Sequence, residues 1–388
     1  MKYKFSSCEK IAFHDIAVHE NRAWFCNIGY NALFQMDILT GKLKLLDFFP
    51  DDNFERLELY APIAYLDNKL YIGPRNGDHI LIYDLEKSSF TTMDIDFEKY
   101  GEKNNYNIFS HVEVIHKKVY FFPGRFRAIV ELDPVSQAIS YIDNWYEELS
   151  EGFFEQEDKR IIFQNIHIDA AGNCILPCWK SQETVILNVC SREYEILRPM
   201  QKSNVSLSDA VEIEGNIIFS YKDERGVGDY KSKNLVALND AELKYTQGLF
   251  LAAYKGWLYI VPMYGNAVVR CLSTTGTKEY IYRFPESISP AAEWIPYKNN
   301  SLFQKVIENN RLAIFSVFDE KFIIVEMETG QVQNLEICLD DEDKRKIQNY
   351  LYTFMSANTI YETECFDLKD FIAIIDTVKE QEDYCENT

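Results

Sequence analysis

The chain has 388 residues, of which 47% are hydrophobic and 14% aromatic, and its formal net charge at pH 7 is −21. A negative field of this size repels nucleic acids and anionic membranes, so we expect neither as a partner. The N-terminus lacks a secretory apolar stretch and no apolar run approaches ~18 residues, which together with nine cysteines, several inside apolar runs, favours a reducing, cytoplasmic location.

One pattern recurs seven times along the chain: a turn, an apolar and aromatic run, a gap, a second apolar run that ends near an acidic or amide residue, and a third run. The copies begin at Asn21, Asn68, Lys117, Gly172, Gly215, Gly256 and Asn310, at intervals of 41 to 55 residues. Short strands with this spacing are typical of propeller blades. The sequence therefore predicts an all-β fold, a seven-bladed β-propeller over residues 1–339, because a twin β-sandwich would not need one pattern seven times.

The first copy predicts four strands, at 11–18, 23–27, 32–37 and 42–48, with a polar turn at 19–22 and a second turn from Asp37 to Gly41. In later copies the third strand is expected to end at Asp84, Asp133, Asn188, Asn239 and Glu326. Residues 2–5 are expected to add a strand to the seventh blade and help to close the ring.

These strand repeats, over about residues 11–338, resemble those of kelch and PQQ-type propellers and of seven-bladed bacterial propellers such as the streptogramin B lyase group. The sequence contains neither the Gly-Gly doublet of kelch repeats nor a Trp-Asp pair closing a blade. The resemblance implies the propeller fold. It transfers no catalytic residue, because the histidine and glutamate motif of the lyases has no residue-by-residue match here.

Four long connections fall on one face of the predicted propeller, at residues 97–107, 144–160, 222–233 and 285–301. Long loops on a rigid scaffold commonly carry binding sites, so this face is the candidate site. The alternative is that aromatic residues in these loops, such as Trp145 and Phe153, pack over the ends of the blades.

The first strand of each blade is expected to line the central channel. Aligning the repeats places seven residues at one level near the loop-rich face: Asp15, Pro62, His111, Asn165, Asp209, Phe250 and Gln304. Five of them are polar or ionisable, which predicts a ligand site at the channel mouth. A water-filled channel would also tolerate polar residues without any ligand.

Basic residues gather where the second strands are expected to end, beside the channel mouth: Arg75, Arg125, Arg127, Lys180 and Lys222, with Tyr264 at the same level. They predict a positive rim suited to a carboxylate, a phosphate or an acidic peptide. In the alternative, these bases pair with acidic loop residues such as Asp78, Glu183 and Asp223.

No nucleophile-elbow, zinc-protease or phosphate-loop motif occurs in the sequence. We therefore expect a non-catalytic recognition or scaffold propeller that binds an anionic small molecule, a glycan or an acidic peptide, without a cofactor. The alternative is a lyase or hydrolase that uses His111 with Asp15 or Asp209 as an acid–base pair. His14, Asp15, His111 and His167 could approach one another, but no metal site is predicted.

Residues 340–388 depart from the repeat. Apolar residues at helical spacing predict an amphipathic helix, namely Ile347, Tyr350, Leu351, Phe354 and Met355, and a second stretch contains Leu368, Phe371, Ile372 and Ile375. An acidic tail follows from residue 379. The helices are expected to pack against the propeller, or otherwise to bind a protein partner.

Overall fold

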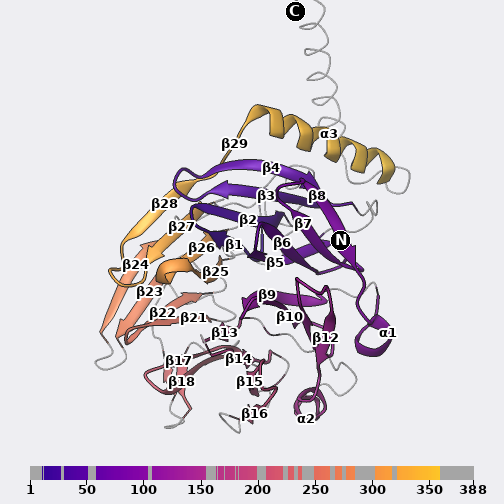
Figure 1. Cartoon of the computed structure of the whole chain (residues 1–388). Coiled ribbons are helices and arrows are strands. Elements are labelled where there is room, and N and C mark those ends of the chain that lie inside the picture. Colours follow the sequence, from indigo (N-terminus) through magenta and orange to yellow (C-terminus); the bar gives the residue numbers. More distant parts are fainter. Residues whose placement is uncertain are drawn as a thin grey trace, which may run out of the picture.

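The computed structural model describes residues 11, 13–27, 30–50, 58–103, 107–153, 163, 165–169, 171–179, 181, 183–198, 207–221, 226–230, 235–237, 249–262, 267–272, 277–284, 302–316 and 321–358. Seven antiparallel sheets radiate from a common centre, with the first strand of each sheet innermost (Figure 1). The seven-bladed propeller predicted from the repeat is confirmed.

The blades follow the chain in order. Blades 1 to 3 comprise β1 Ala17–His19, β2 Arg22–Asn27, β3 Ala32–Asp37 and β4 Lys42–Phe48; β5 Tyr60–Leu66, β6 Lys69–Pro74, β7 Ile80–Asp84 and β8 Ser89–Met93; and β9 Phe109–Ile115, β10 Lys118–Pro123, β11 Ile129–Leu132 and β12 Ile139–Ile142. Blades 4 and 5 comprise β13 His167–Ile168, β14 Asn173–Pro177, β15 Thr184–Asn188 and β16 Tyr194–Leu197; and β17 Leu207–Ile213, β18 Asn216–Tyr221, β19 Gly226–Asp229 and β20 Leu235–Ala237. Blades 6 and 7 comprise β21 Leu249–Tyr254, β22 Trp257–Pro262, β23 Ala267–Leu272 and β24 Lys278–Arg283; and β25 Leu302–Ile307, β26 Arg311–Ser316, β27 Lys321–Glu326 and β28 Val332–Glu336.

The turn between the first and second strands gives each repeat its recognisable start. In blade 2, Asp67 and Asn68 have φ of 49° and 57°, and in blade 6, Lys255 and Gly256 have φ of 45° and 79°. Two successive residues with positive φ form the hairpin turn whose twist matches that of the flanking strands. Asn and Gly tolerate this conformation well, which is why they mark the repeats in the sequence.

The turn between the third and fourth strands depends on the predicted side chain at its start. The Asp37 Oδ1 atom accepts hydrogen bonds from the backbone N–H groups of Leu39 and Thr40, at 2.9 and 3.0 Å. Asp84, Asp133 and Asn188 accept the corresponding bonds in blades 2, 3 and 4. The side chain replaces the backbone acceptors that a tight turn leaves unavailable.

Blade 5 departs from the sequence prediction. Its third strand is β19 Gly226–Asp229, which falls within the predicted connection at 222–233, whereas Asn239, predicted to end that strand, lies outside the described residues. The two glycines at 226 and 228 hid this strand, because glycine weakens a strand pattern.

Two of the long connections contain short helices, α1 Phe97–Tyr100 and α2 Tyr146–Glu151. Trp145, Tyr146 and Phe153 are buried around α2 in the hydrophobic core that also contains residues of blades 3 and 4. For the described part of the 144–160 connection, the prediction of aromatic residues that pack over the blade ends is therefore correct. Residues 285–301 lie outside the described residues.

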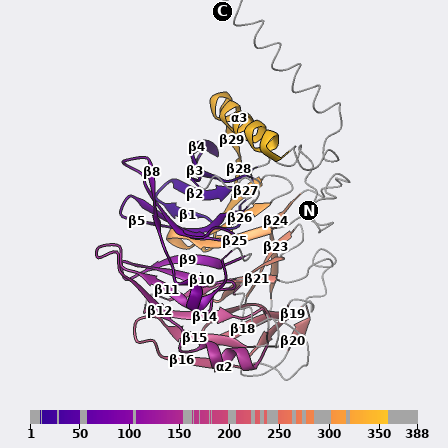
Figure 2. The same ribbon diagram turned by 90° about the vertical axis from the view of Figure 1, so that its right-hand side faces the viewer.

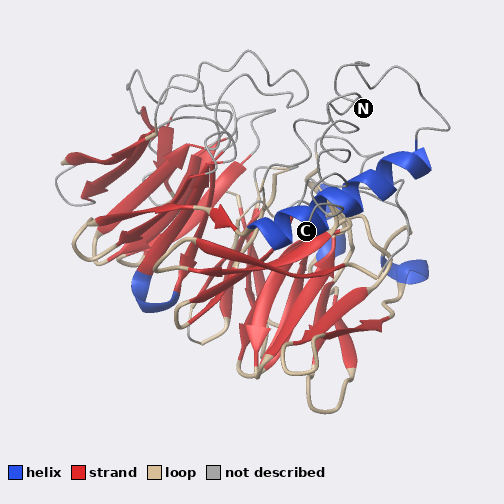
Figure 3. Ribbon diagram, turned by 90° about the horizontal axis from the view of Figure 1, so that it is seen from above, coloured by secondary structure: helices blue, strands red, loops and turns tan. Residues whose placement is uncertain are grey.

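The ring is completed by the C-terminal part of the described chain. After blade 7, β29 Cys338–Leu339 pairs in parallel with β4, so blade 1 acquires a fifth, outermost strand. The helix α3 Asp341–Asn358 follows and lies along blade 1, as two perpendicular views show (Figures 1 and 2). The view from above shows α3 crossing over the strands, with shorter helical segments elsewhere in the described chain (Figure 3).

The prediction that a C-terminal helix packs against the propeller is confirmed for α3. Ile347 and Leu351 are buried in the core of blades 1 and 7, and the Tyr350 ring stacks on Phe48 with 4.0 Å between centroids. The side chains of Phe354 and Met355, the second predicted helix, the acidic tail and the predicted N-terminal strand at residues 2–5 lie outside the described residues.

Candidate functional site

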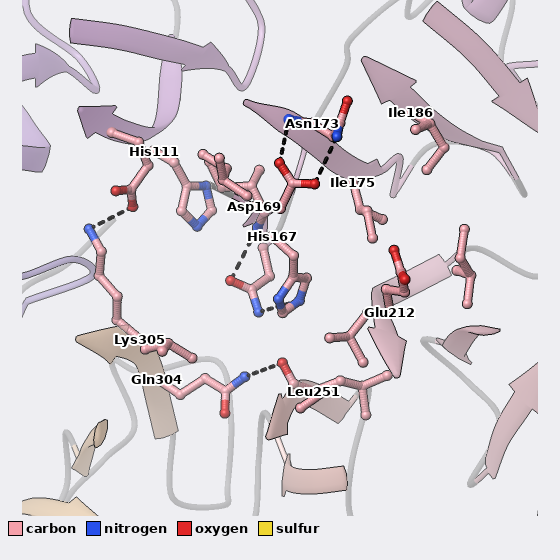
Figure 4. A pocket seen from close by; sticks show the side chains of 18 of the residues that line it. His111, His167, Asp169, Asn173, Ile175, Ile186, Glu212, Leu251, Gln304 and Lys305 are labelled. Atoms are coloured by element: carbon pink, nitrogen blue, oxygen red, sulfur yellow. Dashed lines mark hydrogen bonds and ion pairs between the residues drawn. The ribbon is translucent and has the colours of Figure 1, made fainter. Parts of the chain in front are cut away.

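The propeller centre holds a cavity of about 710 Å³. Its lining comes from the first strands of blades 1, 3, 4, 5, 6 and 7, or from the residues just before them, and part of one wall comes from inner strands of blades 4 and 5. Figure 4 shows these side chains arranged around an open centre. Among the residues predicted at the channel mouth, Asp15, His111, Asn165 and Gln304 line the cavity. Pro62 and Phe250 do not line it and are buried in their blades.

Asp15 connects blade 1 to its two neighbours. Its Oδ1 atom accepts from the Ile16 N–H at 2.8 Å and from Lys305 Nζ at 2.9 Å, and its Oδ2 atom accepts from the Ile63 N–H of blade 2 at 3.0 Å. Lys305 Nζ also lies 3.1 Å from Glu113 Oε1 of blade 3. Burial alone would lower the pKa of Lys305, but the two carboxylates raise it above its ordinary value, so this lysine stays charged.

Asp209 has the equivalent role in blade 5 and is fully buried. Its Oδ1 atom accepts from the Ala210 N–H at 2.7 Å, and its Oδ2 atom accepts from the Leu251 N–H of blade 6 at 2.6 Å and from Asn165 Nδ2 of blade 4 at 2.8 Å. Gln304 Nε2 of blade 7 donates to the Leu251 carbonyl at 3.0 Å.

These contacts form a polar belt that we call the channel girdle: Asp15, Glu113, Asn165, Asp209, Gln304 and Lys305. Through hydrogen bonds and ion pairs it reaches all seven blades. A buried carboxylate needs several donors to offset its desolvation, and the neighbouring blades supply them. Most of the polar side chains that predicted a ligand site therefore hold neighbouring blades together.

The three histidines of the cavity differ in their surroundings. Burial, followed by the charge of Lys305, lowers the pKa of His111 to about 4, and burial with the Arg75 charge lowers the pKa of His14 well below its ordinary value. Both rings are therefore neutral at pH 7. The third, His167, places Nε2 at 3.1 Å from Asp209 Oδ1.

The histidine that contacts Asp209 differs from the one that the sequence analysis paired with it. His111 Nδ1 lies 3.2 Å from Ser110 Oγ, and the described residues show no hydrogen bond between His111 and Asp15 or Asp209. The histidine beside Asp209 is His167, which lies on the adjacent blade. Aligning the seven repeats placed Asn165 at the shared level, but it could not show that His167, two residues later, hydrogen-bonds to the Asp209 carboxylate.

The described residues contain no group of three or more histidine, cysteine, aspartate or glutamate side chains arranged to hold a metal ion. Nor does any described helix have the length and apolar character needed to cross a membrane.

The predicted basic rim is only partly within the described residues. Arg75 Nε pairs with Glu58 Oε2 at 2.9 Å, and the Arg75 side chain is 15% exposed, so here the ion-pair alternative applies with a different acidic partner from those named. Arg125 is half-buried, Arg127 is exposed, and neither lines the cavity. Lys180, Lys222, Tyr264 and Asp223 lie outside the described residues, and Glu183 pairs with Arg198 at 2.6 Å.

Charge and polarity are unevenly distributed over the cavity. Its described lining contains four carboxylates, from Asp15, Glu113, Asp169 and Glu212, but one lysine, Lys305. One wall, between blades 4 and 5, is apolar and includes Ile175, Ile186, Val211 and Ile217. The cavity is therefore acidic on balance and amphipathic.

No protein-family model matches the sequence, and no curated protein matches it. Solved structures share the fold. The chain is similar to a catalytically inactive virginiamycin B lyase from Staphylococcus aureus solved with quinupristin, at 9% identity and a TM-score of 0.56, covering 83% of this chain and 97% of that one. It is also similar to YCF48 from Cyanidioschyzon merolae, at 12% identity and a TM-score of 0.54, covering 83% and 97% of the two chains. At these identities the likeness establishes the seven-bladed β-propeller fold and no specific family.

Proposed function

We propose that this protein is a recognition propeller that binds a small molecule in its central cavity, without catalysing a reaction. The observation that carries the proposal is the cavity itself, whose lining combines side chains from six blades. A pocket of this size with a few convergent polar groups is the usual form of a small-molecule site.

One polar atom of the lining supports a ligand in addition to the girdle's structural role. Gln304 donates through Nε2 to blade 6, whereas its Oε1 atom is buried and has no hydrogen-bond partner among the described residues. Leaving a buried acceptor unpaired costs free energy, which a donor from a ligand would recover. A glycan hydroxyl or an amine would supply such a donor.

Filling the cavity tests this function. Val306 lines it, and 45% of this residue is exposed, so Val306→Trp adds bulk without replacing a girdle residue. The matched control is Val135→Trp, because Val135 is 95% exposed in a turn of blade 3, away from the cavity. A thermal-shift screen of neutral oligosaccharides, acidic sugars, phosphates, acidic peptides and amines should identify compounds that raise the Tm of the wild-type chain by a few degrees.

Ligand stabilisation of the native state scales with concentration over Kd, so a true ligand should give a dose-dependent shift. That shift should persist in Val135→Trp and disappear in Val306→Trp. If no compound class shifts Tm, or if the shift survives in Val306→Trp, recognition in this cavity is refuted.

The His167 and Asp209 pair favours one alternative, a hydrolase or lyase in which His167 accepts a proton and Asp209 orients its ring. The Staphylococcus aureus protein with a similar fold is a lyase. Hydrolysis of p-nitrophenyl acetate above the buffer rate, lost in His167→Gln but retained in His111→Gln, would support this alternative. Equal rates for all three proteins would count against it.

A further inference from the structure

We propose that the ligand of the central cavity is an amine, with a positive charge attached to an apolar body. This inference rests on the proposed recognition function and specifies the chemical class of its ligand. It differs from the anionic class that the basic residues of the sequence suggest.

The charge of the cavity is the first reason. Lys305 is neutralised by two carboxylates, with Nζ at 2.9 Å from Asp15 Oδ1 and 3.1 Å from Glu113 Oε1. An added anion would have to compete with both. Because the pKa values of His14 and His111 are lowered, these rings contribute no positive charge at pH 7.

The second reason is a carboxylate that lacks a cation. Glu212 lines the cavity, is an exposed residue, and makes no hydrogen bond or ion pair within the described part of the chain. Asp169 also lines the cavity, and its carboxylate accepts bonds from the N–H groups of Ala171 and Asn173, with no basic side chain paired to it among the residues that the structure describes. An ammonium group would be attracted to these two carboxylates.

Sheet register places apolar side chains beside Glu212. In blade 5, Glu212 and Ile217 are directly opposite each other across β17 and β18, so both side chains project from the same face. In blade 4, the register aligns His167, Ile175 and Ile186 in one row across β13, β14 and β15. All five residues line the cavity, and Figure 4 shows the blade 4 isoleucines opposite Glu212.

The geometry therefore offers an apolar body one isoleucine-rich wall between blades 4 and 5, with the Glu212 carboxylate on the same sheet face as Ile217. Burying apolar area of the ligand against Ile175, Ile186 and Ile217 would supply affinity, and Glu212 would select the charge. A flat hydrophobic compound without a charge would use only the first of these contributions.

Three compounds of similar size separate the two contributions: 2-phenylethylamine, 2-phenylethanol and 3-phenylpropanoate. Calorimetric titration of the full chain at low salt should show the amine binding about tenfold or more tightly than the alcohol, with the acid weakest. Glu212→Gln should weaken amine binding about three- to tenfold and leave alcohol binding unchanged. Glu98→Gln is the matched control, because Glu98 is exposed on α1 and does not line the cavity.

The outcomes are distinct. Equal binding of amine and alcohol, tighter binding of the acid, no binding of the amine, or an unchanged amine affinity in Glu212→Gln each overturns the amine inference. If other compounds of the thermal-shift screen still bind in a manner that Val306→Trp abolishes, the recognition function survives this result. If none does, both proposals fail.

Discussion

At the scale of single residues, Asp15 and Asp209 show how one side chain can join two blades. Each carboxylate accepts a hydrogen bond from the backbone N–H of the next residue. It accepts another from a residue in the first strand of the following blade, which is Ile63 for Asp15 and Leu251 for Asp209. The sequence predicted that both residues reach the channel at one level. It could not reveal that their oxygens are already occupied, because the donors come from other blades.

We expect Asp209→Ala to destabilise the protein strongly, because the N–H groups of Leu251 and Ala210 would lose their acceptor in a buried place. The expected loss is about 2–4 kcal/mol of unfolding free energy. Urea denaturation measures it. Asp94→Ala is the control, since Asp94 is exposed and pairs only with His79 in the described structure; its cost should stay below about 1 kcal/mol. A loss for Asp209→Ala as small as that of the control would contradict the blade-joining role.

His111 makes the stability depend on pH. Its pKa is about 4 in the folded protein and 6.5 as the ordinary value, so the unfolded state binds more protons between these limits. Stability should therefore fall as the pH is lowered from about 6.5 towards 4, by about 1–3 kcal/mol in total from this residue. In His111→Gln the slope of unfolding free energy against pH should be shallower in this window. Identical slopes for wild type and variant would refute the assignment.

At the scale of elements, the repeat could be recognised in the sequence because its turns require particular residues. The copies found in the sequence begin within two residues of β2, β6, β10, β14, β18, β22 and β26, since the preceding turns require positive φ. Where a turn or strand used atypical residues, as in β19 with its glycines, the pattern failed. The sequence predicted that α3 packs against the propeller but not that it lies along blade 1, because an apolar stripe does not specify the surface that covers it.

The α3 helix protects the outer edge of blade 1. Asp343 lies in its first turn and accepts from the Leu45 N–H of β4 at 2.8 Å, next to the residues of β4 that pair with β29. An uncovered edge strand would leave such N–H groups exposed to pairing with other chains. The helix therefore supplies a hydrogen-bond acceptor to the part of the β4 edge that the short β29 does not pair with.

We expect Asp343→Ala to cost about 1–3 kcal/mol of unfolding free energy, because a buried backbone donor loses a charged acceptor. Asp341→Ala provides a control in the same helical turn: the Asp341 side chain is 91% exposed, against 6% for Asp343. Its effect should stay within about 0.5 kcal/mol. Thermal unfolding of the two variants side by side is sufficient. Similar Tm values for both would show that α3 does not depend on this contact.

At the scale of the whole molecule, two sets of contacts close the ring, and neither could be predicted from the sequence. One is the parallel strand β29, which brings the chain after blade 7 back to blade 1. The other is the channel girdle, in which Lys305 contacts Asp15 of blade 1 and Glu113 of blade 3. Glu113 belongs to a blade that is not adjacent to blade 7, so periodicity along the chain contains no information about the pair.

The ion pair of Lys305 should therefore stabilise the ring as a unit. Lys305→Met leaves two carboxylates near each other without a cation, and we expect it to cost about 2–4 kcal/mol of unfolding free energy. Adding Asp15→Asn removes one of the uncompensated charges, so the double variant should be more stable than the sum of the single effects predicts, by about 1–3 kcal/mol. Lys255→Met is the matched control: its partner Glu328 lies 2.6 Å away, but both side chains are more than 60% exposed, and such pairs contribute about 0–1 kcal/mol. Denaturant titration of the four variants and the wild type gives the coupling directly. Strict additivity of Lys305→Met and Asp15→Asn would mean that the blades close without help from the girdle's ion pair, and that interblade packing alone maintains the channel.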